Sequence, residues 1–145
     1  MFFQQSQKKL PNIVPIKFYR LNCFKTYACM ILGTPIKQFA IYIDLPSGQN
    51  IEAILLKKNK KRPLTCDLMS SIFLGLDVSI KQVIINDNQD DIFFSHIILE
   101  QKKDNLLFIT EIDARPSDSI ALSLMHNAPL FCYKTVLEKS IPFVE

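Results

Sequence analysis

Apolar, aromatic and branched residues gather in several segments of this chain, and in one of them they recur at every second position, a pattern that predicts strands of a sheet. That segment is residues 37–44, in which Phe39, Ile41 and Ile43 fall on one face of such a strand. Segments rich in aromatic and branched residues predict further strands at residues 15–25, 27–34, 81–86, 92–101, 105–114 and 129–133. The acidic residues 87–91 are expected to form the turn of a hairpin within this set.

Other segments carry apolar residues at helical spacing. Residues 45–48 break the third strand, and the pattern then predicts a short helix over residues 49–58. Its last turn contains Lys57 and Lys58, where the helix dipole favours cations. A second helix is expected to start with Thr65 as its N-cap. Its apolar stripe is expected to pack in the core, and comprises Leu68, Met69, Ile72, Phe73 and Leu76.

The most apolar helix is predicted over residues 117–127. Its own side chains are apolar on nearly every side, so the helix must be buried, either inside the domain or at a contact between subunits. A turn or two of helix is also expected at residues 135–140. Residues 129–132 add more apolar area, and a small domain must hide such patches. We therefore expect a homodimer, since a two-fold interface is the commonest way to cover them.

The 145 residues suffice for one domain, and with 48% hydrophobic residues the chain needs no disulfide or metal to build a core. The expected division is a mobile leader over residues 1–11 and a folded domain over residues 12–145. The N-terminus does not look like a signal peptide, and no apolar run has the length of a membrane span. We therefore expect a cytoplasmic protein with no membrane partner, in which Cys23, Cys29, Cys66 and Cys132 are free and buried thiols.

Charge is distributed unevenly along the chain, although the net charge is only +3. Eleven Lys and Arg but two acids occur up to Arg62, and six Lys and Arg but twelve acids follow. This asymmetry suits a basic surface for phosphate, unless the two halves pack together and neutralise each other. The strongest cluster is a predicted loop that contains Lys57, Lys58, Lys60, Lys61 and Arg62.

Two segments repeat one local arrangement, in which Arg-Pro, a hydroxyl residue and an Asp occur at the start of a helix. One runs from Arg62 to Asp67 and the other from Arg115 to Asp118. Each combines free backbone N–H groups with a capping side chain and an acid that balances the positive helix end.

The same two segments carry a resemblance to the bifunctional nuclease domain family. The strongest motif is Ile112-Asp113-Ala114-Arg115-Pro116-Ser117-Asp118-Ser119-Ile120-Ala121-Leu122. The family's other motifs match at Glu52-Ala53, Arg62-Pro63-Leu64-Thr65, Asp67-Leu68, Ala128-Pro129-Leu130-Phe131 and Val136-Leu137-Glu138. The resemblance extends from about Tyr19 to Ile141. It implies nuclease activity on RNA and DNA, dimers and an α+β fold, here a single domain with a curled, mostly antiparallel sheet packed with three to four helices.

The chain departs from the family pattern in two places. Cys66 stands where the family usually has His. The strand at residues 39–44 also lacks the usual Leu-Pro-Ile-rich pattern followed by Gly. A missing His that served as a ligand or proton shuttle would weaken or abolish nuclease activity.

Phosphodiester hydrolysis needs an activated water and groups that stabilise charge on phosphate. Of the two histidines, His96 lies in an apolar strand and His126 at a helix end, so a route assisted by Mg²⁺ or Mn²⁺ fits the residues better than a His-based one. The candidate catalytic residues are Glu52, Asp67, Asp113, Arg115 and Asp118. Asp113 and Asp118 are the candidate metal ligands, and Ser117 joins the basic loop as a candidate nucleic-acid contact.

Each of these acids also has a structural explanation, because helix caps and Arg–carboxylate pairs are common. Tyr19, Tyr27 and Tyr42 are able to stack on bases but as strand residues are more often core. Three functions therefore stay open: a metal-assisted nuclease, a non-catalytic nucleic-acid-binding or regulatory module, and a dimeric protein that binds a small anion at its helix N-termini.

Overall fold

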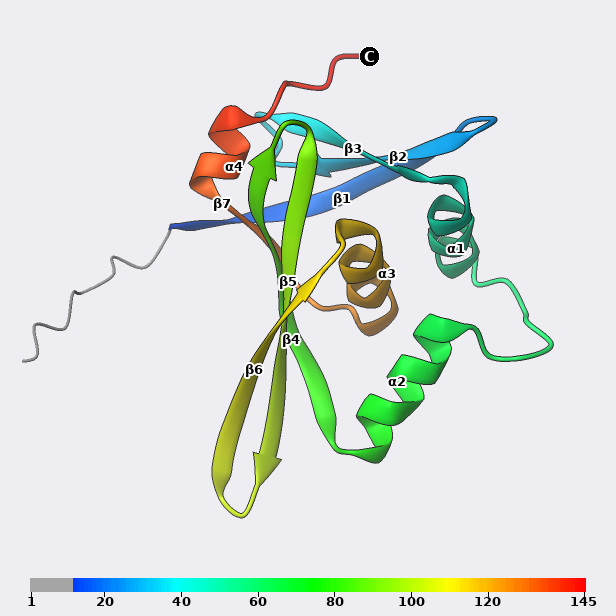
Figure 1. Ribbon diagram of the computed structural model, residues 1–145, viewed down its shortest axis with the longest axis vertical. Coiled ribbons are helices and arrows are strands. Elements are labelled where there is room, and N and C mark those ends of the chain that lie inside the picture. The colour runs from blue at the N-terminus through cyan, green and yellow to red at the C-terminus, as the bar shows by residue number, and fades with distance from the viewer. Residues whose placement is uncertain (1–11) are drawn as a thin grey trace, which may run out of the picture.

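The computed structural model describes residues 12–145, and the predicted leader at residues 1–11 lies outside these residues. One seven-stranded sheet has the order β3-β2-β1-β7-β4-β5-β6 (Figure 1). Its strands are β1 (Ile13–Cys23), β2 (Tyr27–Gly33), β3 (Gln38–Asp44), β4 (Val78–Gln89), β5 (Ile92–Lys103), β6 (Leu106–Ala114) and β7 (Leu130–Tyr133). The helices are α1 (Leu45–Leu55), α2 (Thr65–Gly75), α3 (Pro116–His126) and α4 (Lys134–Lys139).

Neighbouring strands pair antiparallel except β4 and β7, which are parallel. The sheet curls so far that Phe39 of the edge strand β3 stacks on Phe93 of β5, with ring centroids 5.5 Å apart. It remains open, since β3 and β6 are its two edges. These features confirm the expected fold, a single α+β domain with a curled, mostly antiparallel sheet and four helices.

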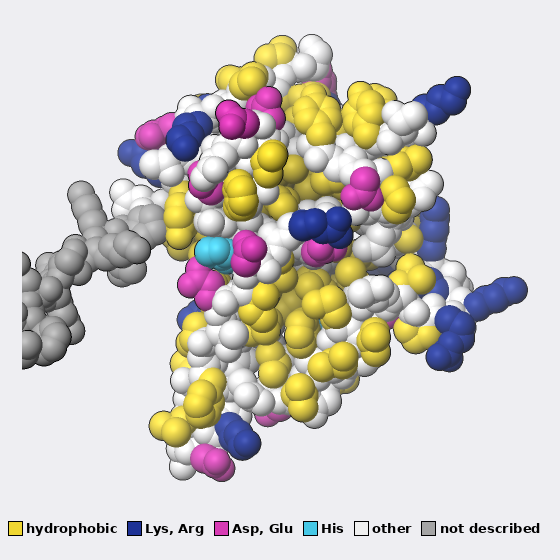
Figure 2. All heavy atoms as spheres, in the orientation of Figure 1, with side chains coloured by type: hydrophobic (Ala, Val, Ile, Leu, Met, Phe, Trp, Pro, Cys, Tyr) yellow, Lys and Arg dark blue, Asp and Glu magenta, His cyan; other side chains and the backbone are white. Residues whose placement is uncertain are grey.

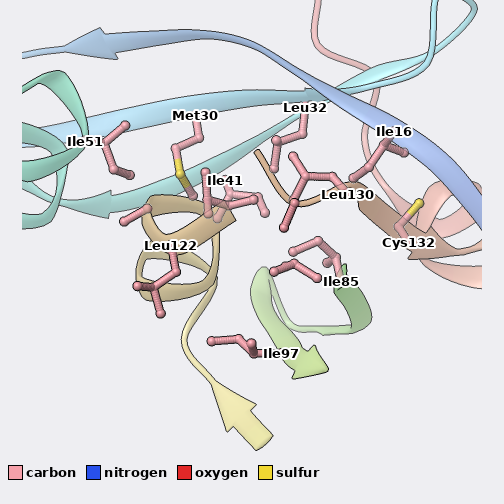
Figure 3. Packing of buried hydrophobic residues seen from close by; sticks show 14 of the residues in the cluster. Ile16, Met30, Leu32, Ile41, Ile51, Ile85, Ile97, Leu122, Leu130 and Cys132 are labelled. Carbon is pink, nitrogen blue, oxygen red and sulfur yellow. The ribbon is translucent and has the colours of Figure 1, made fainter. Parts of the chain in front are cut away.

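Helix α3 lies within the curve of the sheet, where it contacts α1, α2, β4 and β5 (Figure 1). Its residues Ile120, Ala121 and Leu122 are essentially inaccessible to solvent. Figure 3 shows Leu122 among the apolar side chains of the sheet, which include Met30, Ile41 and Ile97. The apolar helix is therefore buried inside its own domain, which was one of the two possibilities that the sequence left open.

Two hairpin turns are tighter than expected because pairs of adjacent residues adopt positive φ. Asp90 and Asp91 have φ of 49° and 64°, and Asp104 and Asn105 have φ of 52° and 62°. Two such residues make the two-residue turn whose twist matches antiparallel strands. The prediction that residues 87–91 form an acidic turn was therefore wrong at its start, because β4 continues to Gln89.

The start of α1 also differs from the expectation. The helix begins at Leu45 rather than at residue 49, because the Asp44 carboxylate accepts hydrogen bonds from the Ser47 backbone N–H and hydroxyl, both at 2.8 Å. Pro46 lies in the first turn, where a missing N–H costs nothing. The helix ends at Leu55, so Lys57 and Lys58 follow it instead of lying in its last turn.

Helix α2 differs in two respects. Leu64 occupies the N-cap position in place of Thr65, and its backbone N–H donates to the Asp67 carboxylate at 2.8 Å. Of the predicted apolar stripe, Met69 and Phe73 pack against the core. Leu68, Ile72 and Leu76 are exposed, so the stripe was only partly a core feature.

The four cysteines are free, as expected, but Cys23 is exposed and only the other three are buried. Burial raises the pKa of the Cys132 thiol to about 11. Within residues 12–145, none of the helices has the length and apolar character that a membrane crossing requires.

Gly48 lets α1 approach β2 closely, because a Cβ added there would lie 2.4 Å from the Ala28 Cβ. We expect Gly48→Ala to lower the free energy of unfolding by about 1–3 kcal/mol through overpacking. Gly75→Ala is the matched control, since a Cβ there meets nothing within 4 Å. It should leave stability unchanged or raise it by up to about 1 kcal/mol. Urea denaturation measures both, and equal effects would contradict the close packing.

Candidate functional site

The starts of α1 and α3 lie close together and are joined by Arg115. Arg115 occupies the N-cap position of α3, and its Nε and Nη2 donate to the two carboxylate oxygens of Asp118 at 2.9 and 3.1 Å. Its Nη1 also lies 3.9 Å from Oδ2 of Asp44, the N-cap of α1. One guanidinium thus lies between two carboxylates, at the positive ends of two helices.

This ion-pair cluster opens onto a cavity of about 290 Å³ between β3, the β4–β5 turn and the start of α3. The cavity is lined by Ile41, Tyr42, Ile43, Asp44, Asp91, Ile92, Phe93, Arg115, Pro116 and Ser117. The Arg115 side chain is 66% exposed. It is therefore both anchored by Asp118 and accessible to a ligand that enters from solvent.

The charges of the cluster reinforce one another. Hydrogen bonds from Ser47 lower the pKa of the Asp44 carboxyl below its usual value of 3.8, and Arg115 adds to this effect. The hydrogen bonds and charge of Asp118 raise the pKa of Arg115 above its already high value. Asp44 is consequently ionised and a weak proton acceptor at neutral pH, and it is better suited to pair with cations than to serve as a base.

Asp44 is a residue that the sequence analysis missed. It was placed at the end of a strand because the helix was expected to start later. An Asp three residues before a Ser, with Pro in the first turn, is a helix-start signal that would have identified it.

The other predicted acids lie elsewhere. Asp113 pairs with His96 across β5 and β6. The next residue pair, Ser95 and Ala114, faces α3, because the Ser95 hydroxyl bonds both the Ala114 carbonyl and Ser119 of α3 at 2.6 Å. Since side chains alternate along a strand, Asp113 points away from α3. The structure therefore does not bring Asp113 and Asp118 together as a pair of metal ligands.

Glu52 and Asp67 each have local partners. Glu52 accepts a weak hydrogen bond from Cys23 Sγ at 3.8 Å. Asp67 accepts from Lys60 Nζ at 2.6 Å and from the Leu64 backbone, and these bonds lower the pKa of its carboxyl. Neither acid contacts Arg115 or Asp118 among the ion pairs of the described residues.

The two Arg-Pro segments, though alike in sequence, are thus paired differently. In the first, Asp67 binds Lys60 and not Arg62. In the second, Asp118 binds Arg115 itself. Ser117 lines the cavity but is only 7% exposed, so little of its hydroxyl surface faces a ligand.

Every residue of the basic loop, residues 57–62, is exposed, and the loop borders a shallow, open depression together with Pro63 and Asp67. Lys60 is paired with Asp67. Within residues 12–145, Lys57, Lys58, Lys61 and Arg62 have no carboxylate within 4 Å. These four cations are therefore available to an anionic partner.

Cys66, the position of the family's His, is buried where α2 meets α1, and Asn50 Nδ2 donates to its sulfur at 3.6 Å. His126 of α3 binds Ser70 of α2, with 2.8 Å between Nε2 and Oγ. Neither His96 nor His126 lines the Arg115 cavity. No group of three or more His, Cys, Asp or Glu side chains within residues 12–145 is arranged to hold a metal ion.

Comparison with known proteins agrees with the motifs at this site. The family model of the bifunctional nuclease domain matches residues 30–144, which include Asp44, Arg115 and Asp118. This chain belongs to the bifunctional nuclease domain family. That assignment places the Arg115 cluster inside the matched domain.

Two related sequences come from Mycobacterium tuberculosis, the "Uncharacterized protein MT1877" of strain CDC 1551 and the "Uncharacterized protein Rv1829" of strain H37Rv. Each is 33% identical to this member of the bifunctional nuclease domain family over 103 residues. The match covers 68% of this chain and 58% of each relative, so the relatives extend well beyond it.

The lowered pKa of Asp44 has a consequence for stability. A carboxyl whose pKa is lower in the folded state stabilises the fold above its unfolded pKa, and this contribution is lost as the pH falls through the folded value. Asp44→Asn keeps a capping side chain but removes the charge. We expect it to reduce stability at pH 7 by less than about 1 kcal/mol, because Asp44 is exposed.

At a pH well below 3.8, wild type and Asp44→Asn should converge, because Asp44 is then also uncharged. Urea denaturation at both pH values measures the difference. A gap of the same size at both would contradict the charged cap.

Proposed function

We propose that the chain hydrolyses phosphodiester bonds of RNA or DNA in the cavity around Arg115. The observation that supports it best is the position of Arg115, which lies between Asp44 and Asp118 and within the residues that match the family. A guanidinium binds two phosphate oxygens at once, as it binds the two oxygens of Asp118. The N-termini of α1 and α3 add partial positive charge at the same place.

In this proposal, an incoming phosphate takes over the Nε and Nη2 donors that Asp118 now occupies. The exposure of the Arg115 side chain permits that exchange without movement of the backbone. Arg115 then stabilises the charge that develops on phosphate as the attacking water adds. Asp118, released from these donors, becomes free to orient that water, whose oxygen forms the new bond to phosphorus while the bond to the departing sugar oxygen breaks. Solvent accepts the proton that the water loses and supplies the proton that the departing oxygen gains.

The residues present also fit a divalent cation in type. Mg²⁺ and Mn²⁺ prefer oxygen ligands, and Mg²⁺ is often held by one or two carboxylates together with substrate phosphate. Asp44 and Asp118 would hold such an ion, which would supply an activated water and charge for the phosphate. This assignment uses Asp44 in place of Asp113, which faces away from α3.

The exposed loop of residues 57–62 has the composition of a phosphate-tracking element. Phosphate contacts by Lys and Arg give affinity without sequence preference and weaken steeply with salt. Lys57, Lys58, Lys61 and Arg62 are proposed to serve this role. Lys60 contributes less, because its charge is already neutralised by Asp67.

The second candidate function is a nucleic-acid-binding module without catalysis. It is favoured by Cys66 in place of the family's His and by the lack of a histidine among the residues that line the Arg115 cavity. The two functions share the phosphate site and differ in whether the bound strand is cut.

Cleavage assays on RNA and single-stranded DNA, with Mg²⁺, with Mn²⁺ and with chelator, test the proposal. Arg115→Gln should reduce cleavage by about a hundredfold or more, as expected when one charge-stabilising donor is lost. Arg20→Gln is the matched control, because Arg20 pairs with Glu145 and does not line the Arg115 cavity, and it should retain cleavage within a few-fold.

Thermal melts must show both variants folded. A folded and fully active Arg115→Gln protein would refute the assignment of the site. Wild-type protein that binds the strands but cuts neither with any metal would favour the binding module.

A dimer would need an exposed apolar surface, and this surface differs from the one that the sequence suggested. The apolar helix and the strand after it, which suggested a dimer, are covered within the domain. The exposed apolar surface lies instead along β6, in which every residue from Leu106 to Asp113 is exposed. Figure 2 shows hydrophobic side chains across this lower part of the molecule. The exposed apolar residues of β6 are Leu106, Leu107, Phe108, Ile109 and Ile112, and Leu68, Ile72 and Leu74 of α2 and the following Leu76 are exposed as well.

We propose that β6 pairs antiparallel with β6 of a second copy. One edge of this strand has no partner within the described sheet, and a long apolar edge invites pairing. The ends of β6 are also oppositely charged, since Lys102 and Lys103 adjoin its first residue and Glu111 and Asp113 lie near its last. A two-fold axis would place these ends beside each other.

Light scattering at micromolar concentration should therefore show a dimer. Ile109→Lys should convert it to a monomer, because a charge would be buried at the centre of the paired strands. Ile36→Lys, at a residue 98% exposed in the turn between β2 and β3, should leave the dimer intact. A monomeric wild-type protein, or a dimeric Ile109→Lys protein, would contradict this interface.

A further inference from the structure

Three aromatic side chains form a row on the surface. The rings of Phe24 and Tyr27 stack with centroids 4.9 Å apart, and the Tyr27 and Tyr42 centroids are 5.9 Å apart. All three residues are exposed, by 48%, 41% and 67%, and none belongs to the hydrophobic core. The expectation that Tyr19, Tyr27 and Tyr42 are core residues was therefore wrong, since Tyr19 is exposed as well.

The row begins at the Arg115 cavity and leads away from it. Tyr42 lines that cavity together with Arg115. Tyr27 pairs in register with Asp44, which approaches Arg115. Phe24 lies beyond Tyr27, at the turn between β1 and β2, and the exposed Lys25 follows it in that turn. A cation thus lies at each end of the row.

Rows of exposed rings have a known physical use. Aromatic side chains offer flat faces on which the bases of single-stranded nucleic acid stack, while neighbouring cations hold the backbone. The faces of bases in a duplex are covered by their own stacking, so such a row selects unpaired strands. A carbohydrate also stacks on rings, but as a neutral ligand it would gain nothing from the two cations.

We propose that the row of Phe24, Tyr27 and Tyr42 binds the bases of a single-stranded nucleic acid whose phosphate lies on Arg115. This inference rests on the proposed function for the location of the phosphate. It adds the substrate class, an unpaired strand, and three residues that recognise it. The alternative role of the row is local, since cross-strand aromatic contacts stabilise sheets without any ligand.

Two labelled oligonucleotides separate base stacking from phosphate binding. One is a thymidine strand of about 12 nucleotides, within the usual range for such sites, and the other is an abasic strand of equal length and charge. Fluorescence anisotropy in the presence of chelator measures their affinities without cleavage. The thymidine strand should bind about tenfold or more tightly than the abasic strand, and than a duplex of the same length.

The variants then assign the contacts. Tyr42→Ala should weaken binding of the thymidine strand by about tenfold and leave abasic binding unchanged. Arg115→Gln should weaken both, and Tyr19→Ala, outside the row, should weaken neither. The chain has four Tyr and no Trp, so quenching of intrinsic fluorescence by the thymidine strand reports directly on the tyrosines.

Equal affinity for thymidine and abasic strands would overturn the inference, as would a folded Tyr42→Ala protein with unchanged binding. The second result would leave the row a purely structural feature. Base-dependent binding without cleavage in Mg²⁺ or Mn²⁺ would refute the hydrolytic function but support the row. Cleavage together with equal affinity for the thymidine and abasic strands would support the hydrolytic function but refute the role of the row in base binding.

Discussion

The burial of α3 within the curved sheet is the constraint on which this structure depends. A helix with apolar residues on nearly every side needs cover all round, and the sheet supplies it by curling until Phe39 and Phe93 meet. Two buried serines of the helix are satisfied locally, with Ser119 bonded to Ser95 and Ser123 to the Ala128 carbonyl at 2.7 Å. These two hydroxyls therefore do not oppose the burial.

This burial also determines where the charged start of α3 lies. Because Ile120 and Leu122 fix the helix in the core, Arg115 emerges at the seam between β3 and the β4–β5 turn. The close approach of α1 to β2 at Gly48 brings Asp44 to the same seam. Two segments some 70 positions apart in the sequence thus form one ion-pair cluster, although neither segment alone constitutes a site.

Much of the fold followed from local pattern. Segments rich in aromatic and branched residues predicted the strands, and helical spacing of apolar residues predicted the helices, because these patterns reflect which faces are buried. Errors occurred where a local signal was outweighed by another. Asp44 and Pro46 start α1 inside a segment that appeared to be a break, and Leu68, Ile72 and Leu76 have helical spacing but face solvent. Nothing within one chain's pattern distinguishes a core stripe from an exposed one.

The site was predictable in part. The motif identified Arg115 and Asp118, which do contact each other. The location of Asp113 depends on strand register, since one residue's shift reverses the face of a side chain. The row of Phe24, Tyr27 and Tyr42 depends on pairing between β1, β2 and β3, which sequence spacing does not reveal.

The central claim is that Arg115 exchanges its carboxylate partner for a phosphate. A crystal structure with a short phosphorothioate oligonucleotide, which resists cleavage, tests this most directly. The account predicts that a backbone phosphorothioate lies on Nε and Nη2 of Arg115, with Asp118 displaced from them. An Arg115 side chain still bound to Asp118, with the oligonucleotide held only on the loop of residues 57–62, would contradict it.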